Sequence, residues 1–383
     1  MQYRPLPSTE QTNQCHRPDT AQTKLIAPAR QPTPTPIPRC FPPLSRPIHA
    51  RPHRPPAPLD PSSLAIYHGP PTLMTAPTPV STTTKLLTIG RDIKLSHSVF
   101  ALPFAGLAAC YAAGGWPTAQ QIALLLWCMF FARTFAMLCN RFVDRRIDAA
   151  NPRTAGRALP AGRLRPRDAV AAIVLCALMF IAGAAGFIFA NHPPNPWPLI
   201  CSPLVLAWLG AYGLFKRFTV LAHFFLGGAL GISPIAAVIA IDPTILADPM
   251  PWLLGAFVLL WVAGFDVIYA IQDIDVDRAQ QLHSIPARLG PAGALIAAKI
   301  IHLAALGLLV TIQRTALPFR SHQFIPDTNL SFFALGMLIV ALLLIAEHRA
   351  AARGQFTMAF FTLNGVISLV LGALGIADIL PFS

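Results

Sequence analysis

The sequence predicts an all-α polytopic membrane protein with nine transmembrane helices. Of its 383 residues, 54% are hydrophobic and only 12% are charged, and the mean hydropathy is +0.54. About 25% of the residues of an ordinary soluble domain are charged, so this composition favours a chain that faces lipid. The apolar residues gather in stretches long enough to cross a bilayer, and the loops between them alternate in positive charge.

The first 81 residues differ in composition from the rest of the chain. Residues 1–80 hold 20 of the 39 prolines and show no apolar periodicity. Proline removes the amide donor that helices and strands need, so we expect residues 1–81 to be a Pro/Arg-rich disordered tail and residues 82–383 to form the membrane domain. Two alternatives stay open for the tail: a targeting segment, or a gene start placed too early, with Met74 as the initiator.

The seven cysteines and the net charge of +13 do not indicate a disulfide framework, a zinc site or a nucleic-acid partner. The number of cysteines is odd, and none of them forms a CxxC pair. The cations are concentrated in the tail and in certain short loops, where membrane topology accounts for them. We therefore expect the lipid bilayer as a partner and no nucleic acid.

Nine apolar stretches are long enough to span a membrane. A helix needs about 20 residues to cross ~30 Å of hydrocarbon. The stretches of this length are 96–115, 119–140, 168–190, 197–215, 219–241, 251–270, 291–312, 330–347 and 358–380. The fourth is the least secure because Pro203 interrupts it.

The charges of the loops predict the orientation. The loops near Gly115, Pro193 and Pro249 contain no Lys or Arg, whereas residues 141–167 contain eight Arg. Cytoplasmic loops carry an excess of Lys and Arg, so the amino terminus and the ends of the second and sixth stretches are predicted to face the cytoplasm. We therefore expect an integral membrane protein.

Acidic residues gather in two short windows at these cytoplasmic ends. In the first window, Asn140, Asp144 and Asp148 follow the spacing i, i+4, i+8, which stacks their oxygen atoms on one helical face. Ionisable groups near membrane depth usually face a cavity, a partner or an ion.

The second window shows a similar spacing. Asp266, Asp273 and Asp277 are separated by seven and four residues, so they share a face of a continuous α-helix, while Asp275 points elsewhere. The sequence therefore predicts two acidic helical faces on one side of the membrane.

A bound Mg²⁺ would explain the two windows. Carboxylates this close together repel one another, and Mg²⁺ characteristically bridges one or two carboxylates to substrate phosphates. Nearby arginines can bind the remaining phosphate charge. The alternative is that the acids form ion pairs in loops with Arg141, Arg145, Arg146 and Arg278. Two motifs on one membrane side favour the metal.

These motifs resemble those of the UbiA superfamily of intramembrane aromatic prenyltransferases. Residues 140–148, with 151–160 after them, are similar to the first signature of the family, and residues 266–277 to the second. Residues 283–290 resemble the loop of the 4-hydroxybenzoate polyprenyltransferases and their menaquinone-pathway relatives. The resemblance covers residues 85–380 and implies nine helices around a lateral, lipid-facing, prenyl-binding cavity that the two Asp motifs cap.

The resemblance also implies the reaction and its location, an active site on the cytoplasmic side of a bacterial inner membrane. Mg²⁺ would bridge a polyprenyl diphosphate to the motifs, whose acids are the catalytic residues. The expected metal ligands are Asn140, Asp144, Asp148, Asp273 and Asp277. The expected acceptor is an aromatic acid, 4-hydroxybenzoate of ubiquinone-type quinone biosynthesis, and the alternative is a menaquinone (futalosine) pathway acceptor or another aromatic. An ion-coupled transporter is a distant alternative, because its acids would lie at mid-membrane.

Further residues are candidates for substrate binding. The whole set is Asn140, Arg133, Arg141, Lys216, Asp266 and Tyr269. The three cations would bind the diphosphate or the acceptor carboxylate, although cations at helix ends also satisfy topology. Asp266 would orient an arginine or a metal-bound water, or make a structural hydrogen bond. Tyr269 would stabilise a cation with its ring face or anchor the chain at the membrane interface.

Two polar residues in the apolar stretches are expected to be structural. His223 has no partner at metal-ligand spacing, and Asn364 lies inside the ninth stretch. Interior hydrogen bonds are the expected role of both.

Overall fold

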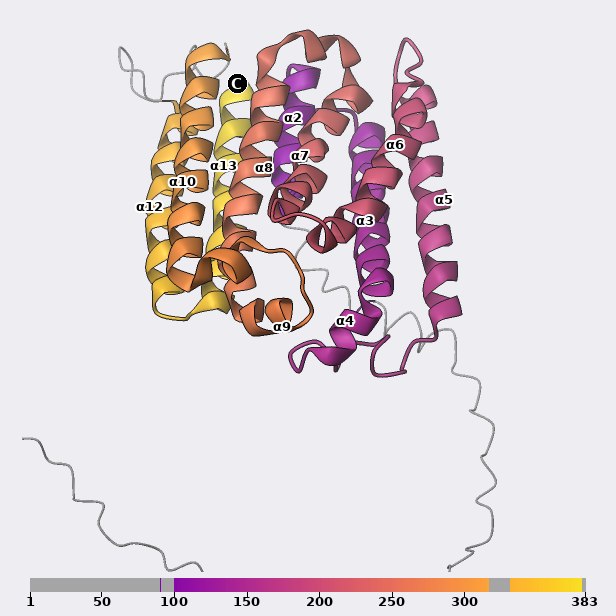
Figure 1. Cartoon of the computed structure of the whole chain (residues 1–383). Helices are drawn as coiled ribbons and strands as arrows, with labels where there is room; N and C mark the ends of the chain where they lie inside the picture. The colour runs from indigo at the N-terminus through magenta and orange to yellow at the C-terminus, as the bar shows by residue number, and fades with distance from the viewer. Residues whose placement is uncertain (1–89, 91–99, 317–330, 381–383) are drawn as a thin grey trace, which may run out of the picture. The chain divides into compact units, whose positions relative to one another are not determined.

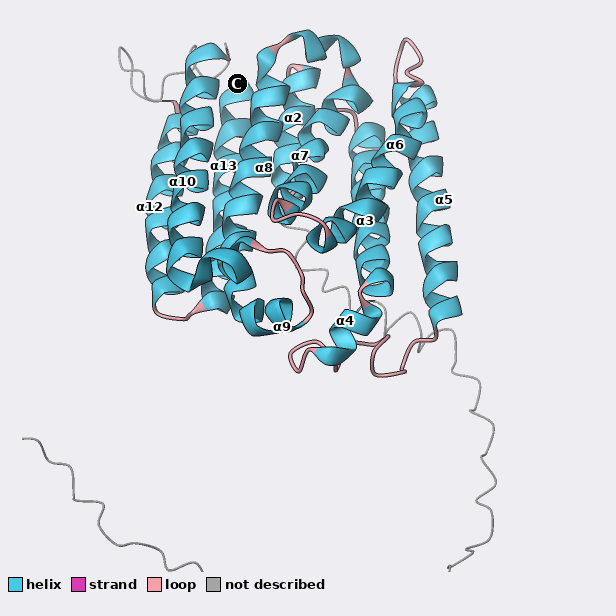
Figure 2. Cartoon of the chain, viewed as in Figure 1, coloured by secondary structure: helices cyan, strands magenta, loops and turns pink. Residues whose placement is uncertain are grey.

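The computed structural model describes residues 90, 100–316 and 331–380 (Figure 1). In this part of the chain, the regular secondary structure is entirely helical, as predicted (Figure 2). The long helices are α3 (Ala119–Val143), α5 (Pro166–Ala190), α6 (Trp197–Ala211), α7 (Ala222–Ile241), α8 (Pro249–Ala270), α10 (Ile285–Thr315), α12 (Phe332–Ala352) and α13 (Asn364–Ile379). The shorter elements are α2 (Leu102–Ala113), α4 (Arg145–Ala150), α9 (Ile274–Ala279), the 3₁₀ segments η3 (Tyr212–Arg217), η4 (Pro243–Ala247) and η5 (Ile271–Asp273), and the π-helical segment η6 (Met358–Leu363). The predicted tail, residues 1–81, lies outside the described residues.

Several helices begin where the sequence carries a start signal. α3 begins with a capping box, in which Gln121 N donates to Thr118 Oγ1 at 3.2 Å and Thr118 N donates to Gln121 Oε1 at 2.8 Å. α5, α6 and α8 have proline in their first turn, where its missing amide proton costs no intrahelical hydrogen bond. These signals fix the helix starts to within a few residues of the predicted ones.

Eight of the nine predicted stretches correspond to helices that are long and apolar enough to cross a membrane. The fourth stretch is among them, because the helical segment Trp197–Arg217 continues through Pro203. The first stretch corresponds to α2, an apolar helix of 12 residues. The first four residues of that predicted stretch, 96–99, lie outside the described part of the chain.

The close approach of α7 and α8 depends on small residues. Gly227 and Gly231 lie four residues apart on α7, and a Cβ atom added at Gly231 would lie 2.6 Å from the carbonyl oxygen of Gly255 on α8. Lipid tails are as apolar as leucine, so helices associate in a bilayer through close backbone packing at such small residues. α8 is consequently the most deeply buried of the candidate spans.

The two acidic windows lie at the same end of the helix bundle. α4, which follows α3, and α9, which follows α8, are found together there, and the carboxyl end of α13 lies at the opposite end (Figure 1). This arrangement agrees with the predicted common side of the two windows. That this side faces the cytoplasm stays a prediction.

A cavity of about 760 Å³ lies between α2, α3, α5, α6, α7 and α8. Its lining is mainly apolar, and its charged residues are Arg133, Arg141 and Asp266. All three lie in the halves of α3 and α8 that lead to α4 and α9. The cavity therefore combines an apolar body with a polar end next to the acidic windows.

The cavity reaches the outer surface of the bundle. Leu126 and Phe130 on α3 and Leu204 on α6 line it, yet their exposed fractions are 49%, 45% and 74%. In a membrane protein such an apolar surface faces lipid. This observation supports the lateral opening that the sequence predicted.

Replacing Asn364 by leucine is expected to lower the stability of the protein. Asn364 is fully buried; its Oδ1 accepts from Trp261 Nε1 at 2.7 Å, and its Nδ2 donates to Glu347 Oε1 at 3.1 Å and to Ala359 O at 2.9 Å. The substitution removes all three hydrogen bonds, and each buried group left unsatisfied costs about 1–3 kcal/mol. Thermal unfolding in detergent should show a lower midpoint for Asn364→Leu than for wild type. Val366→Ala, at an exposed position of the same helix, is the control, and equal midpoints for all three proteins would refute the prediction. The expected structural role of Asn364 agrees with these contacts.

Candidate active site

The first acidic window spans the junction between α3 and α4. The helical segment that carries Asn140, Asp144 and Asp148 is interrupted at Asp144, because α3 ends at Val143 and Asp144 stands between the two helices with φ −88° and ψ 4°. Aspartate has a low helix propensity, and its side chain here is bound to a different element. Two backbone hydrogen bonds nevertheless keep the helical spacing, from Asp144 N to Asn140 O at 2.9 Å and from Asp148 N to Asp144 O at 2.8 Å.

Asp144 is bound by two cations of η3. Lys216 Nζ lies 2.5 Å from Asp144 Oδ2, and Arg217 Nη2 lies 3.4 Å from Asp144 Oδ1. The carboxylate side chain is only 3% exposed. Gly213 permits the close approach of η3 to α3, because a Cβ atom at this position would lie 2.9 Å from Asn140 Nδ2. η3 thereby brings the predicted residue Lys216 to the first window.

The second acidic window is also divided. The uninterrupted α-helix predicted from Asp266 to Asp277 is wrong, because α8 ends at Ala270 and η5 separates it from α9. The tighter 3₁₀ turn changes the rotation per residue. The spacing of an α-helix therefore no longer places Asp266, Asp273 and Asp277 on one face. Asp275 is exposed, whereas Asp273 and Asp277 are partly buried.

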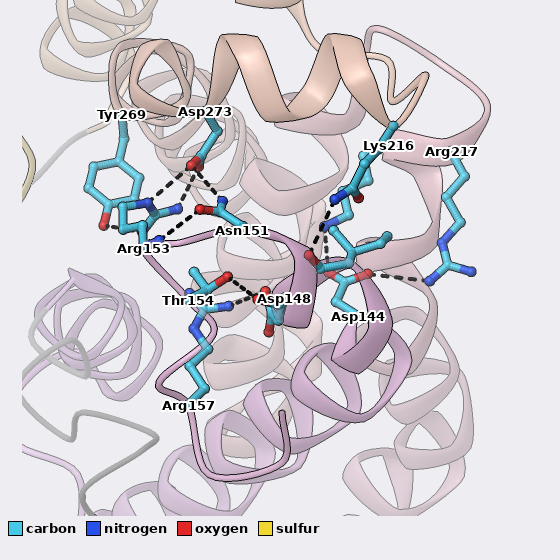
Figure 3. A network of polar contacts seen from close by, with 12 residues as sticks. Asp144, Asp148, Asn151, Arg153, Thr154, Arg157, Lys216, Arg217, Tyr269 and Asp273 are labelled. Carbon is cyan, nitrogen blue, oxygen red and sulfur yellow. Dashed lines mark hydrogen bonds and ion pairs between the residues drawn. The ribbon is translucent and has the colours of Figure 1, made fainter. Parts of the chain in front are cut away.

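Arg153 connects the loop after the first window to the second window (Figure 3). Its Nη2 and Nε donate to Asp273 at 2.5 and 3.0 Å, and its Nη1 donates to Tyr269 Oη at 3.2 Å. Asn151 Nδ2 also donates to Asp273, at 3.0 Å. Partial burial disfavours the charged guanidinium, but the hydrogen bond to Asp273 and its charge outweigh burial and raise the pKa of Arg153 above its ordinary value.

The loop after α4 is held by its own polar residues (Figure 3). Arg153 N donates to Asn151 Oδ1 at 2.9 Å, and Thr154 Oγ1 donates to Asp148 O at 3.0 Å. Arg157 Nη1 forms an ion pair with Asp148 Oδ1 at 2.7 Å. The sequence assigned no role to Asn151, Arg153 or Arg157. The signals for them were their position directly after the first window and the similarity of residues 151–160 to the first family signature.

Three of the four aspartates that are expected to bind the metal, Asp144, Asp148 and Asp273, thus form ion pairs within the protein. The alternative interpretation of the sequence named Arg141, Arg145, Arg146 and Arg278 as partners. The structure shows ion pairs of these aspartates with Lys216, Arg217, Arg157 and Arg153. The fourth aspartate, Asp277, accepts a hydrogen bond from Ser284 Oγ at 2.7 Å. Cations and donors therefore stabilise the carboxylates in this structure.

Asp266 and Tyr269 line the cavity one turn apart on α8. Asp266 Oδ2 lies 2.7 Å from His223 Nδ1, which confirms the interior hydrogen bond expected of that histidine. The ring of Tyr269 packs against Phe360, with centroids 4.2 Å apart, and the Arg153 guanidinium lies 5.4 Å from its centroid. Tyr269 therefore lines the cavity and contacts both Arg153 and Phe360.

Arg133 lies deeper in the cavity than the acids. It precedes Asn140 by seven residues on α3, which corresponds to about 10 Å along the helix axis at 1.5 Å per residue. Its Nε and Nη2 atoms are buried and have no hydrogen-bond partner. Arg141 is also buried and lines the cavity, as does Tyr212, which the sequence analysis missed. A guanidinium with buried, unsatisfied donors is a strong candidate to bind an anion.

The ligand chemistry of the two windows fits Mg²⁺. Their predicted ligands are all oxygen atoms, which this ion prefers. Asp148 Oδ2 is buried and has no hydrogen-bond partner, so this oxygen is available to a ligand. Among the described residues, no three side chains of His, Cys, Asp or Glu already lie close enough together to hold a metal ion.

Comparison with known proteins identifies the family. The profile of the UbiA prenyltransferase family matches residues 101–373, and the chain therefore belongs to this family of membrane enzymes. The chain is similar to the 4-hydroxybenzoate octaprenyltransferase of Edwardsiella ictaluri, with 29% identity over 269 residues that cover 69% of this chain and 85% of that protein. The corresponding protein of Yersinia enterocolitica is 32% identical over 228 residues, which cover 58% of this chain and 72% of that protein.

Solved structures share the fold. The apo structure of a UbiA homolog from Aeropyrum pernix K1 is 33% identical, with a TM-score of 0.65, over 75% of this chain and 99% of that one. A UbiA homolog from Archaeoglobus fulgidus, solved bound to GPP and Mg²⁺, is 18% identical, with a TM-score of 0.54, over 76% of this chain and 99% of that one. The predicted class, an intramembrane prenyltransferase, is confirmed, and the transporter alternative is set aside.

Proposed function

We propose that the protein transfers a polyprenyl group from polyprenyl diphosphate to 4-hydroxybenzoate, in a Mg²⁺-dependent step of ubiquinone-type quinone biosynthesis. The observation that carries the proposal is the apolar cavity of about 760 Å³ with the two acidic windows beside its polar end and Arg133 inside it. The similar proteins of E. ictaluri and Y. enterocolitica are 4-hydroxybenzoate octaprenyltransferases. The A. fulgidus homolog, which shares the fold, was solved with a prenyl diphosphate and Mg²⁺.

The acids of the two windows are the proposed metal ligands and catalytic residues. The set is Asn140, Asp144, Asp148, Asp273 and Asp277. When bound, Mg²⁺ would neutralise the diphosphate and make it a better leaving group. The protein orients the ligands through hydrogen bonds to neighbouring residues, among them the bond from Ser284 to Asp277. Such support fixes the direction of each carboxylate.

The cationic side chains that pair with the aspartates of the two windows in this structure are proposed to bind the diphosphate of the substrate. Lys216 and Arg153 each lie 2.5 Å from a motif carboxylate, and Arg157 lies 2.7 Å from another. A diphosphate carries several negative charges, so it competes for the same cations through charge-assisted hydrogen bonds. We propose that these side chains would bind the diphosphate when the carboxylates hold Mg²⁺.

The cavity is proposed to hold both organic groups. Its apolar body would bind the prenyl tail and exclude water. Departure of the diphosphate leaves an allylic cation on the prenyl group, and water would otherwise react with this cation to give an alcohol. Arg133 would bind the acceptor carboxylate. The bond between the allylic carbon and the diphosphate oxygen breaks, a carbon–carbon bond forms ortho to the acceptor hydroxyl, and the ring loses a proton. Arg141, Asp266 and Tyr269, which line the same end, would contact the substrates there.

We also propose a cytoplasmic active site in a bacterial inner membrane. The eight arginines of residues 141–167 lie at the end of the bundle where α4 and α9 meet. The excess of cations on the cytoplasmic side of membrane proteins supports this orientation.

A product assay tests the proposal. Purified protein with Mg²⁺, geranyl diphosphate and 4-hydroxybenzoate should form a prenylated hydroxybenzoate, detected by mass, and a chelator in excess of Mg²⁺ should prevent it. Parallel reactions would contain naphthoate-type and futalosine-derived acceptors. Product from one of these alone would replace the proposed acceptor, and the lack of product from every acceptor would contradict the proposed reaction.

A further inference from the structure

Four aromatic side chains form one wall of the cavity near its polar end. We call Phe100, Phe265, Tyr269 and Phe360 the aromatic wall, and all four line the cavity. The ring of Phe360 lies at its centre: its centroid is 4.2 Å from that of Tyr269, 5.1 Å from that of Phe265 and 5.8 Å from that of Phe100. The last two pairs are nearly perpendicular, at 88° and 82°.

The position of Phe360 is fixed by the π-helical segment η6. A π-helix has a wider turn than an α-helix, and such segments occur frequently at functional sites. Asn364 Nδ2 donates to Ala359 O at 2.9 Å inside this segment, and Asn364 is itself bound to Trp261 and Glu347. The backbone that carries Phe360 is therefore held from two other helices, α8 and α12.

The aromatic wall belongs to the same cavity as Arg133. A flat aromatic acid needs a cation for its carboxylate and an apolar surface for its ring. Aromatic rings favour edge-to-face or offset contacts with centroids about 4.5–7 Å apart, and the aromatic wall offers both ring faces and ring edges. The side chains that line the rest of the cavity are mainly aliphatic and suit a prenyl tail.

We infer that the aromatic wall binds the ring of the acceptor and that Phe360 restricts the acceptor to a single ring. This inference rests on the proposed function and adds a determinant of acceptor size to it. Phe360 lines the cavity and packs against the other three rings of the wall, so its truncation would leave a void that borders the cavity. Removal of a large apolar side chain from a packed site leaves a void, and a void of about 150 Å³ can admit a benzene ring.

The test compares two acceptors in matched variants. The measured quantity is kcat/KM for 1,4-dihydroxy-2-naphthoic acid divided by kcat/KM for 4-hydroxybenzoate, with Mg²⁺ and geranyl diphosphate. Phe360→Ala should raise this ratio by about tenfold or more, since even one methylene group in an apolar pocket changes discrimination by about 10–200-fold. Met358→Ala is the control, because Met358 lies on the same π-helical segment, is exposed and does not line the cavity. The control ratio should equal that of wild type.

The possible outcomes separate the inference from the proposed function. If wild type prenylates 4-hydroxybenzoate and the ratio of Phe360→Ala is unchanged, only the inference is overturned. An equal fall of kcat with both acceptors in Phe360→Ala would also overturn the inference, because it would indicate that the wall stabilises the allylic cation. If wild type prenylates neither acceptor, the proposed function and the inference both fail. Should Phe360→Ala not fold, Phe360→Leu is measured instead, and it must raise the ratio by about threefold.

Discussion

Replacing Asp144 by asparagine is expected to lower turnover by about 10³-fold or more. The substitution keeps the size of the side chain and removes the negative charge that is proposed to bind Mg²⁺. Loss of a single group that stabilises developing charge costs about 10²–10³ in kcat, and loss of a metal ligand removes the ion's contribution as well. Turnover would be measured as prenylated product per minute from purified protein at saturating Mg²⁺. Asp273→Asn is expected to show a loss of the same size.

Insertion and folding of these variants should be preserved. The partners of Asp144 are partly exposed, since the side chains of Lys216 and Arg217 are 30% and 36% exposed, so water can solvate them when the carboxylate is gone. Asp275→Asn is the matched control, because Asp275 lies in the second window but is exposed; it should keep wild-type turnover. Wild-type turnover in Asp144→Asn would show that this carboxylate is not a required ligand.

The helices could be predicted from the sequence because the bilayer sets their length. About 20 apolar residues are needed to cross it, and eight of the nine predicted stretches are helices of this kind. The exception is the stretch that contains α2, whose described helix has 12 residues. Loop charges predicted the common side of the two windows, because orientation depends on the composition of short loops.

The interruptions of the helices could not be predicted. Asp144 leaves the helical conformation where it is bound to Lys216, which is 72 residues away, and Asp273 is bound to Arg153, which is 120 residues away. Periodicity within one segment contains no information about such partners. The π-helical segment η6 likewise depends on Asn364 and its hydrogen bonds to Trp261 and Glu347, and no residue of 358–363 signals an inserted turn.

The sequence identified the acidic residues of the candidate site but only some of its cationic residues. Carboxylates are rare in this chain, so six of them in two windows stood out. Arginines are common at cytoplasmic helix ends for reasons of topology, and Arg153 and Arg157 could not be distinguished from their neighbours. Lys216 and Arg133 were named, but the sequence did not decide whether each binds diphosphate or carboxylate.

The position of Arg133 deep in the cavity supports the carboxylate of the acceptor as its ligand. Three cations already lie within 2.7 Å of motif carboxylates, where a diphosphate would be held. Arg133 is about 10 Å further along α3, and two of its buried nitrogen atoms have no hydrogen-bond partner. A carboxylate on an acceptor ring bound beyond the diphosphate would satisfy these donors.

Replacing Arg133 by leucine is therefore expected to raise KM for 4-hydroxybenzoate by about 30-fold or more, with little change of KM for geranyl diphosphate. Loss of one partner of a buried, hydrogen-bonded charge pair costs about 2–5 kcal/mol, and each 1.4 kcal/mol corresponds to a factor of about ten. The methyl ester of 4-hydroxybenzoate provides the control, because it has the same ring and no negative charge. Wild type should use the ester poorly, and Arg133→Leu should use it at least as well as wild type does. A rise of KM for geranyl diphosphate instead would assign Arg133 to the diphosphate and leave the acceptor carboxylate to Arg141.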